Sequence, residues 1–215
     1  MTTQTLQYIE TRGFHLRGFV GGVLLATCGL AAALSTPAVV FDPLAQAALT
    51  AAGWTSFVLG LAMRFWATLY VGGRKVGGRR EATLTVVGPY SIVRNPLYVG
   101  SFLIGLSTAL ILGSGSLLAA LLIAAAYYSW YTVPAEEAFL RRTVGEAIFD
   151  DYASRTPRYW PNWSLYQSPP ETTFPAKALR NEARRAARLL LVPIAFTLLA
   201  ALRSEPWWPA WFQLP

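Results

Sequence analysis

Polar residues that could capture an anionic ligand stand in the segment 88–100, which reads GPYSIVRNPLYVG. Arg94 and Asn95 precede Pro96, and a proline here is typical of the first turn of a helix. Asn95 would then lie at the N-cap, where spare backbone N–H groups and the helix dipole favour a negative group. Tyr98 follows in the first turn, although a capped helix with an interfacial arginine and tyrosine would show the same residues.

Two adjacent carboxylates, Glu136 and Glu137, stand just beyond an apolar run. Anions are poorly solvated at a membrane boundary, so their presence there is unusual. Neighbouring residues on a helix point about 100° apart, and both carboxylates therefore cannot face the same ligand atom. We expect one to bind a ligand and the other to pair with Arg141 or Arg142; a solvated helix end with local ion pairs is an equal alternative.

A third candidate is Arg158, which lies in the segment TPRYWP at 156–161. Prolines and aromatic residues on both sides hold this arginine more rigidly than a free tail would. It could bind a substrate carboxylate or phosphate through two parallel hydrogen bonds. Its alternative role is that of an anchor to lipid headgroups.

Several well-known sites are missing from the sequence. It contains no dinucleotide-binding G-x-G-x-x-G after a strand, no P-loop, no H-E-x-x-H and no G-x-S-x-G. His15 is the single histidine and Cys28 the single cysteine, so we expect no metal centre. The net charge of +7 could indicate nucleic acid, but no nucleic-acid-binding motif accompanies it, and we expect no such partner.

The composition favours a membrane protein. Charged residues make up 13% and hydrophobic residues 54% of the 215 residues, against roughly 25% charged residues in soluble domains. We predict an all-α integral membrane protein with about five spans, at Phe19–Val40, Leu44–Tyr70, Leu97–Leu112, Leu117–Val133 and Ala186–Leu202. A Gly-Ser turn at 113–116 should fold the third and fourth runs into a short antiparallel hairpin, with small residues permitting close packing.

The distribution of positive charge predicts the orientation. With five spans, all Lys and Arg except Arg64 and Arg203 fall on the side of the N-terminus. The positive-inside rule makes that side cytoplasmic, and we expect a bacterial inner membrane. The segment Lys177–Arg188 is expected to form a basic helix on the anionic leaflet before the last span, and Trp207, Trp208, Trp211 and Phe212 an aromatic belt.

The hairpin should bring the polar segments together. Because its two helices are antiparallel, Asn95 and Tyr98 must lie on the same side of the membrane as Glu136 and Glu137. We expect three regions: N-terminal membrane helices and a basic loop at 1–87, the hairpin with a cytoplasmic ligand-binding segment at 88–170, and a basic helix with the last span at 171–215.

These segments resemble the isoprenylcysteine carboxyl methyltransferase family of integral membrane methyltransferases, which is related to the phospholipid N-methyltransferases. The family pattern is G-P-Y, R-H-P-x-Y-x-G, a helical hairpin, an E-E pair and P-R-aromatic-x-P. The matching stretches are GPYSIVRNPLYVG, EEAFLRRTVGEAIFDDY and TPRYWP, over about 88–161. Asn95 replaces the family histidine; its amide can donate a hydrogen bond but is neither acid nor base near neutral pH.

The resemblance implies S-adenosylmethionine as the methyl donor, bound by the hairpin and the segment after it. Cofactor-binding positions fall on Asn95, Pro96, Leu97, Tyr98, Gly100, Glu136, Glu137 and Tyr152, and catalytic positions on Arg158, Glu137 and Arg94. The implied acceptor is a lipid or lipophilic molecule, methylated on a carboxyl oxygen or an amine nitrogen. A carboxylate acceptor would need an arginine for orientation, and an amine would need Glu136 or Glu137 as a base.

Two other readings of the sequence stay open. The first is a membrane enzyme resembling the NADPH-dependent sterol reductases. The second is a non-enzymatic membrane transporter or assembly protein. Transporters usually carry polar groups at mid-bilayer, whereas the polar groups here gather at one interface, which counts against the second reading.

Overall fold

The computed structural model describes residues 31, 35–37, 41–72, 84–168, 176–203, 205–208 and 212–214. The chain forms two compact units, one of residues 41–197 and one of residues 1–40 with 198–215. All the candidate residues lie in the larger unit. His15, Cys28 and most of the predicted first span lie outside the described residues, and the division into three regions stays a prediction.

The predicted all-α class is confirmed, with one small exception among the described residues. A parallel pair of three-residue strands, β1 (Ser35–Pro37) and β2 (Phe212–Leu214), interrupts the helical pattern. The end of the predicted first span is therefore extended rather than helical. Pro37 explains part of this difference, because a proline ring disfavours a helix at the residue before it.

Three described helices are long and apolar enough to cross a membrane: Pro43–Tyr70, Gly115–Val144 and Ala183–Arg203. The first is most of α2 (Pro43–Gly72), and the last belongs to α8 (Ala176–Arg203). A shorter apolar helix, α4 (Pro96–Leu112), lies where the third span was predicted. The length and apolar composition of these helices are those of an integral membrane protein.

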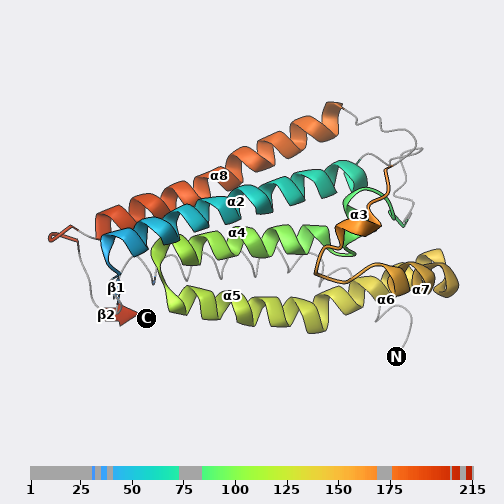
Figure 1. Cartoon of the computed structure of the whole chain (residues 1–215), viewed down its shortest axis with the longest axis horizontal. Coiled ribbons are helices and arrows are strands. Elements are labelled where there is room, and N and C mark those ends of the chain that lie inside the picture. The colour runs from blue at the N-terminus through green and yellow to red at the C-terminus, as the bar shows by residue number, and fades with distance from the viewer. Residues whose placement is uncertain are drawn as a thin grey trace, which may run out of the picture. The chain divides into compact units, whose positions relative to one another are not determined.

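The predicted hairpin is formed by α4 and α5 (Gly115–Tyr127), which lie side by side in Figure 1. Gly113 ends α4 in the left-handed conformation with φ 59°, which a residue with a Cβ rarely adopts. Ser114 then caps α5, because its hydroxyl accepts a hydrogen bond from the Leu117 N–H at 3.3 Å. The turn predicted at this position is therefore confirmed.

The closest packing, however, is between α2 and α4 rather than within the hairpin. Gly60 and Gly100 face each other there, and a Cβ added to either would lie 2.7 Å from the carbonyl oxygen of the other. Only glycine permits so close an approach of two helix backbones. Small residues thus allow α4 to pack closely against α2. The sequence analysis had predicted that they would allow close packing within the hairpin instead.

Helix α5 does not end at the boundary predicted after Val133. It continues through a π-helical turn, η1 (Tyr128–Thr132), into α6 (Val133–Val144). Pro134 therefore lies inside a continuous helix that also carries Glu136 and Glu137. The basic segment expected to form a separate helix at 177–188 is likewise continuous with the last span in α8, because alanine, leucine and arginine leave no helix breaker between them.

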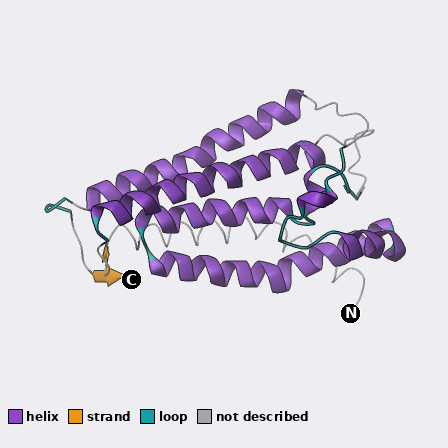
Figure 2. Cartoon of the chain, viewed as in Figure 1, coloured by secondary structure: helices purple, strands orange, loops and turns teal. Residues whose placement is uncertain are grey.

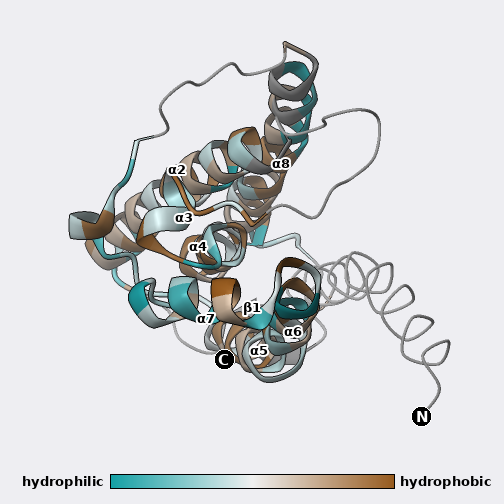
Figure 3. Ribbon diagram, turned by 90° about the vertical axis from the view of Figure 1, so that its right-hand side faces the viewer, coloured by the Kyte–Doolittle hydropathy of each residue, from teal (hydrophilic) through white to brown (hydrophobic). Residues whose placement is uncertain are grey.

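Short elements gather at one end of the larger unit: α3 (Pro89–Ile92), α7 (Glu146–Arg155) and η2 (Trp163–Leu165). Seen end-on in Figure 3, hydrophilic residues are prominent on α6 and α7. Residues 156–168, which we call the strap and which include η2, run from α7 back past α3 (Figure 2).

Backbone hydrogen bonds and an aromatic stack hold the strap in place. The Arg94 N–H donates to the Pro157 carbonyl at 2.8 Å, and the Asn162 N–H donates to the Ile92 carbonyl at 2.9 Å. On α2, Trp66 stacks on Trp163 with ring centroids 6.1 Å apart and planes 10° from parallel. The strap therefore connects the segment before α4 with the end of α2.

Candidate functional site

A buried carboxylate forms the centre of the candidate site. Glu137 on α6 is 9% exposed, and three side chains from other segments reach it. Arg158 of the strap donates from Nε to Glu137 Oε1 at 3.2 Å and from Nη2 to Oε2 at 2.6 Å. Arg94 Nη1 lies 3.5 Å from Oε1, and Asn95 Nδ2 donates to the same oxygen at 3.4 Å. We call these four residues the Glu137 cluster.

The two-pronged contact between Arg158 and Glu137 is the strongest link of the cluster. Parallel N–H···O bonds from a guanidinium to a carboxylate combine charge with a fixed geometry. Hydrogen bonding to Glu137 raises the pKa of Arg158 above its ordinary value, and the negative charge of Glu137 adds to this effect. Asn95 also donates to the Arg158 carbonyl at 3.3 Å, so this amide ties the strap to the start of α4.

Asn95 occupies the N-cap position of α4, as predicted, but its side chain does not cap the helix. The side-chain amide instead points its donors at Glu137 and Arg158. The predicted meeting of the two polar segments is therefore confirmed in the pairing of Asn95 with Glu137. One of the two carboxylates was expected to pair with Arg141 or Arg142. Arg141 instead pairs with Asp150 on α7, and Glu137 is approached by Arg94 and Arg158. A pairing of Glu136 with Arg142 stays a prediction.

An aromatic pair adjoins the start of α4. The ring of Tyr98 lies 5.5 Å from that of Tyr128, centroid to centroid, with an interplanar angle of 47°. Tyr128 belongs to the π-helical turn and was absent from the predicted site. The faces of two such rings carry negative electrostatic potential, which attracts cations.

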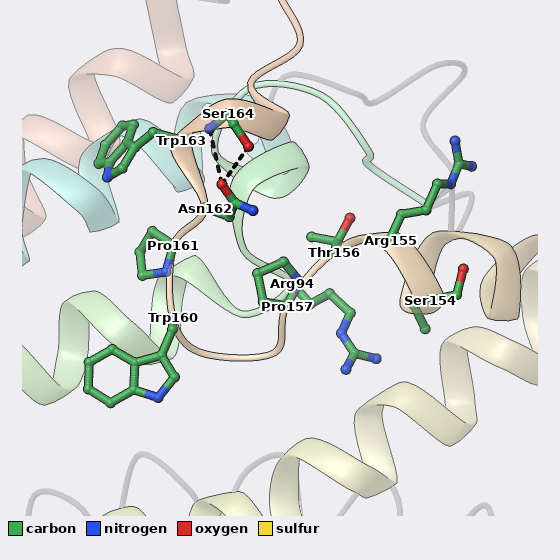
Figure 4. Close-up of a pocket in the computed structure, with 11 residues that line it drawn as sticks. Arg94, Ser154, Arg155, Thr156, Pro157, Trp160, Pro161, Asn162, Trp163 and Ser164 are labelled. Carbon is green, nitrogen blue, oxygen red and sulfur yellow. Dashed lines mark hydrogen bonds between the residues drawn. The ribbon is translucent and has the colours of Figure 1, made fainter.

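Two polar atoms in this region are buried without a hydrogen-bond partner: Nε of Arg94 and the hydroxyl of Tyr159. An unpartnered buried donor costs free energy, roughly 1–3 kcal/mol for a neutral group. Arg94 also lines an open pocket of about 770 Å³ (Figure 4). The remaining lining comes from the end of α7 and from the strap with its η2 turn, and Trp160 and Trp163 contribute large apolar surfaces.

Tyr152, predicted to contact the cofactor, is buried on α7, and its hydroxyl donates to the Tyr90 carbonyl at 2.8 Å. Burial raises the pKa of Tyr152 far above its ordinary value, while the positive charge of Arg94 opposes the shift. Burial likewise raises the pKa of Tyr90. These two tyrosines therefore link α7 to α3 beside the Glu137 cluster.

The other predicted cofactor residues occupy different surroundings. Pro96 is fully buried in the first turn of α4, and Gly100 lies against α2, where an added Cβ would meet Arg64 Cγ at 2.6 Å. The Leu97 carbonyl accepts a hydrogen bond from Arg64 at 3.2 Å, so this arginine is bound to α4. Glu136 is partly exposed on α6.

Among known families, residues 48–147 match the model of the phospholipid methyltransferases. The chain is 30% identical over 178 residues to the nickel-cobalt-cadmium resistance protein NccN of Alcaligenes xylosoxydans xylosoxydans, covering 81% of this chain and 78% of that protein.

It is also 38% identical over 104 residues to the cobalt-zinc-cadmium resistance protein CzcN of Cupriavidus metallidurans, covering 48% of this chain and 45% of the relative. No solved structure matches the chain. The matched family region includes α4, Asn95 and Glu137, whereas Arg158 and the strap lie beyond it. The chain belongs to the family of NccN and carries a region of the phospholipid methyltransferase family at residues 48–147.

Proposed function

We propose that the protein is an integral membrane methyltransferase that uses S-adenosylmethionine to methylate a lipid or lipophilic acceptor. The observation that carries the proposal is the Glu137 cluster, in which a buried carboxylate, an amide and two guanidinium groups converge. The Tyr98–Tyr128 pair lies about one turn along α4 from Asn95 of this cluster. The family match over residues 48–147 supports the same reaction class. We place this end of the chain on the cytoplasmic side, because the positive residues gather there.

The side chains present fit the proposed cofactor. S-adenosylmethionine carries a carboxylate, an ammonium group, ribose hydroxyls and a sulfonium that supplies an activated methyl group. The unpartnered Nε of Arg94 would donate to the carboxylate, and Glu137 would accept from the ammonium or a ribose hydroxyl. Tyr98 and Tyr128 would face the sulfonium, since aromatic faces attract cations.

The residues of the cluster would bind and orient rather than move protons. Both oxygens of Glu137 already accept hydrogen bonds from Arg158, and this geometry favours a holding role over proton abstraction. Methyl transfer from a sulfonium depends chiefly on in-line placement of the acceptor, which a rigid site provides. Methylation of a carboxyl oxygen needs no base, whereas an amine acceptor would use Glu136, the carboxylate next to the cluster.

The names of the two relatives concern resistance to nickel, cobalt, zinc and cadmium. The described residues contain no group of three or more His, Cys, Asp or Glu side chains that could hold a metal ion. If this chain takes part in such resistance, we propose that it does so by methylating a membrane component.

Methyl transfer can be measured directly. The purified protein in lipid nanodiscs would be incubated with S-adenosylmethionine that carries a radioactive methyl group. The lipids would then be extracted and the radioactivity of the extract counted. We expect label in the extract, strong loss of label with Glu137→Gln, and no loss with Asp150→Asn, which changes an exposed ion pair nearby.

The same preparation separates the other functions. Oxidation of NADPH without methyl transfer would indicate a reductase. If the preparation shows neither activity and calorimetry detects no binding of S-adenosylmethionine, the methyltransferase proposal is excluded.

A further inference from the structure

The π-helical turn η1 changes which residues of its helix can face the same partner. Glu137 follows Tyr128 by nine positions in one continuous helix. In a regular α-helix each residue turns by about 100°, so these two side chains would point about 180° apart. Yet both lie against α4 or the residue that caps it, because Tyr128 contacts Tyr98 and Glu137 contacts Asn95.

The wide turn resolves this conflict. The Val133 N–H bonds to the Tyr128 carbonyl, five residues back instead of four. Such a turn absorbs one extra residue, which reduces the angle between Tyr128 and Glu137 to about 80°. Both side chains then belong to one face of the helix. Figure 1 shows α5 lying beside α4 and continuing as one ribbon into α6.

Pro134 supplies the reason for a wide turn at this place. In a regular helix a proline lacks the N–H that would bond four residues back, and its ring clashes with that carbonyl, here the one of Trp130. Widening the preceding turn relieves this clash without ending the helix. The sequence around Pro134 thus sets the rotation of the residues that follow it.

We propose that the π-helical turn sets the register of the candidate site, with Pro134 as its positioning residue and Tyr128 as a further binding residue. Tyr128 and Tyr98 form an aromatic wall for the cationic sulfonium of the methyl donor, roughly 13 Å along the helix axis from Glu137. The part concerning the sulfonium rests on the proposed function, whereas the part concerning register does not.

Cysteine cross-linking tests the register in the full-length protein. In a Cys28→Ala background, one variant carries Tyr98→Cys with Tyr128→Cys, and another Asn95→Cys with Glu137→Cys. We expect a short bismaleimide to cross-link both pairs in the membrane. Tyr98→Cys with Tyr131→Cys is the control and should not cross-link, because Tyr131 is 66% exposed. Cross-linking of only one of the two test pairs would overturn the proposed register.

A deletion and an insertion show whether the extra residue is the cause. Removing Ser129 shortens the spacing between Tyr128 and Glu137 from nine positions to eight, which a regular α-helix turns by the same angle of about 80°, so both pairs should still cross-link. Inserting an alanine after Thr132 of the intact chain adds a residue that the wide turn does not absorb, and it should abolish cross-linking between positions 95 and 137 while retaining it between 98 and 128. Unchanged cross-linking after the insertion, or loss of the 95–137 cross-link after the deletion, would contradict the proposal. If these variants do not fold, the two pairs in the full-length chain still decide.

Calorimetry tests the role of Tyr128. Tyr128→Leu should weaken binding of S-adenosylmethionine about fivefold, a typical loss for one aromatic contact to a cation, and Tyr131→Leu should leave it unchanged. Equal binding by both variants would remove Tyr128 from the site. If the wild-type protein does not bind S-adenosylmethionine but both cysteine pairs cross-link, the proposed function fails and the register stands.

Discussion

The helices from α5 to α7 carry similar side chains on two faces. The inward face lies toward α4 and the strap, the outward face is exposed, and the surroundings of the side chains differ accordingly. Inward, Glu137 is buried and bound by groups from two other segments. Outward, Asp150 pairs with Arg141, and each side chain is 47% exposed. The aromatic residues repeat this contrast, because Tyr128 contacts Tyr98 while Tyr127 stacks on Tyr131 at the exposed surface.

The contrast teaches that residue type alone does not identify the site. An exposed ion pair contributes only about 0–1 kcal/mol, because water and salt screen it. A carboxylate that converges with arginines and an amide in a buried setting is held in one geometry, and removing it leaves charges without a partner. Matched substitutions on the two faces should therefore differ sharply in their effects.

The largest difference is expected for the two carboxylates. Glu137→Ala should weaken binding of S-adenosylmethionine about 100-fold, the loss of one to two charged hydrogen bonds. It should also lower the free energy of unfolding by about 2 kcal/mol, less than for a fully buried pair, since the Arg158 side chain is 40% exposed. Asp150→Ala should change neither quantity measurably. Calorimetry measures the binding and thermal unfolding measures the stability of both variants. Similar losses in Glu137→Ala and Asp150→Ala would show that the two faces do not differ.

The next difference concerns the arginines. Arg158→Lys keeps the charge but loses the two-pronged contact with Glu137, so methyl transfer should fall about tenfold. Arg155→Lys, at an exposed pair with Asp151 on α7, should retain full activity. Initial rates with labelled donor measure both. Full activity of Arg158→Lys would mean that charge suffices without the fixed geometry.

A smaller difference is expected for the aromatic residues. Tyr98→Leu should weaken binding of S-adenosylmethionine about fivefold, because one ring face is lost. Tyr98→Phe keeps that face and should bind within twofold of the wild type, on the order of RT in free energy. Tyr131→Leu is the outward control and should bind normally. Calorimetry compares the three variants, and equal losses in Tyr98→Leu and Tyr98→Phe would assign the effect to the hydroxyl instead.

The smallest effect concerns pH. The pKa of Tyr152 in the folded protein lies above its ordinary value of 10.0. The unfolded chain therefore loses this proton first, and the stabilisation present below about pH 10 is lost as the pH rises. Tyr152→Phe should make the decline in stability above about pH 10 less steep and cost about 1 kcal/mol at pH 7, for the lost bond to Tyr90. Thermal unfolding from about pH 8 to pH 11 measures both.

Much of the arrangement could be predicted from particular residues. Gly113 and Ser114 predicted the turn of the hairpin, since a left-handed residue followed by a cap is a local property. The antiparallel hairpin then required Asn95 and Glu137 to lie at the same end. By contrast, the facing of Gly60 and Gly100 joins helices far apart in the sequence, and glycine alone does not say which partner it admits.

The sequence by itself determined the helical membrane class, the hairpin and the end of the molecule where polar residues gather, because apolar length, turn residues and charge act locally. Only the tertiary structure decided which groups meet. A single extra residue in the turn before Pro134 rotates Glu137 by about 100°, and the strap brings Arg158 to it from another segment. Rotation along a helix accumulates with every residue, so one irregular turn decides which face the following residues occupy.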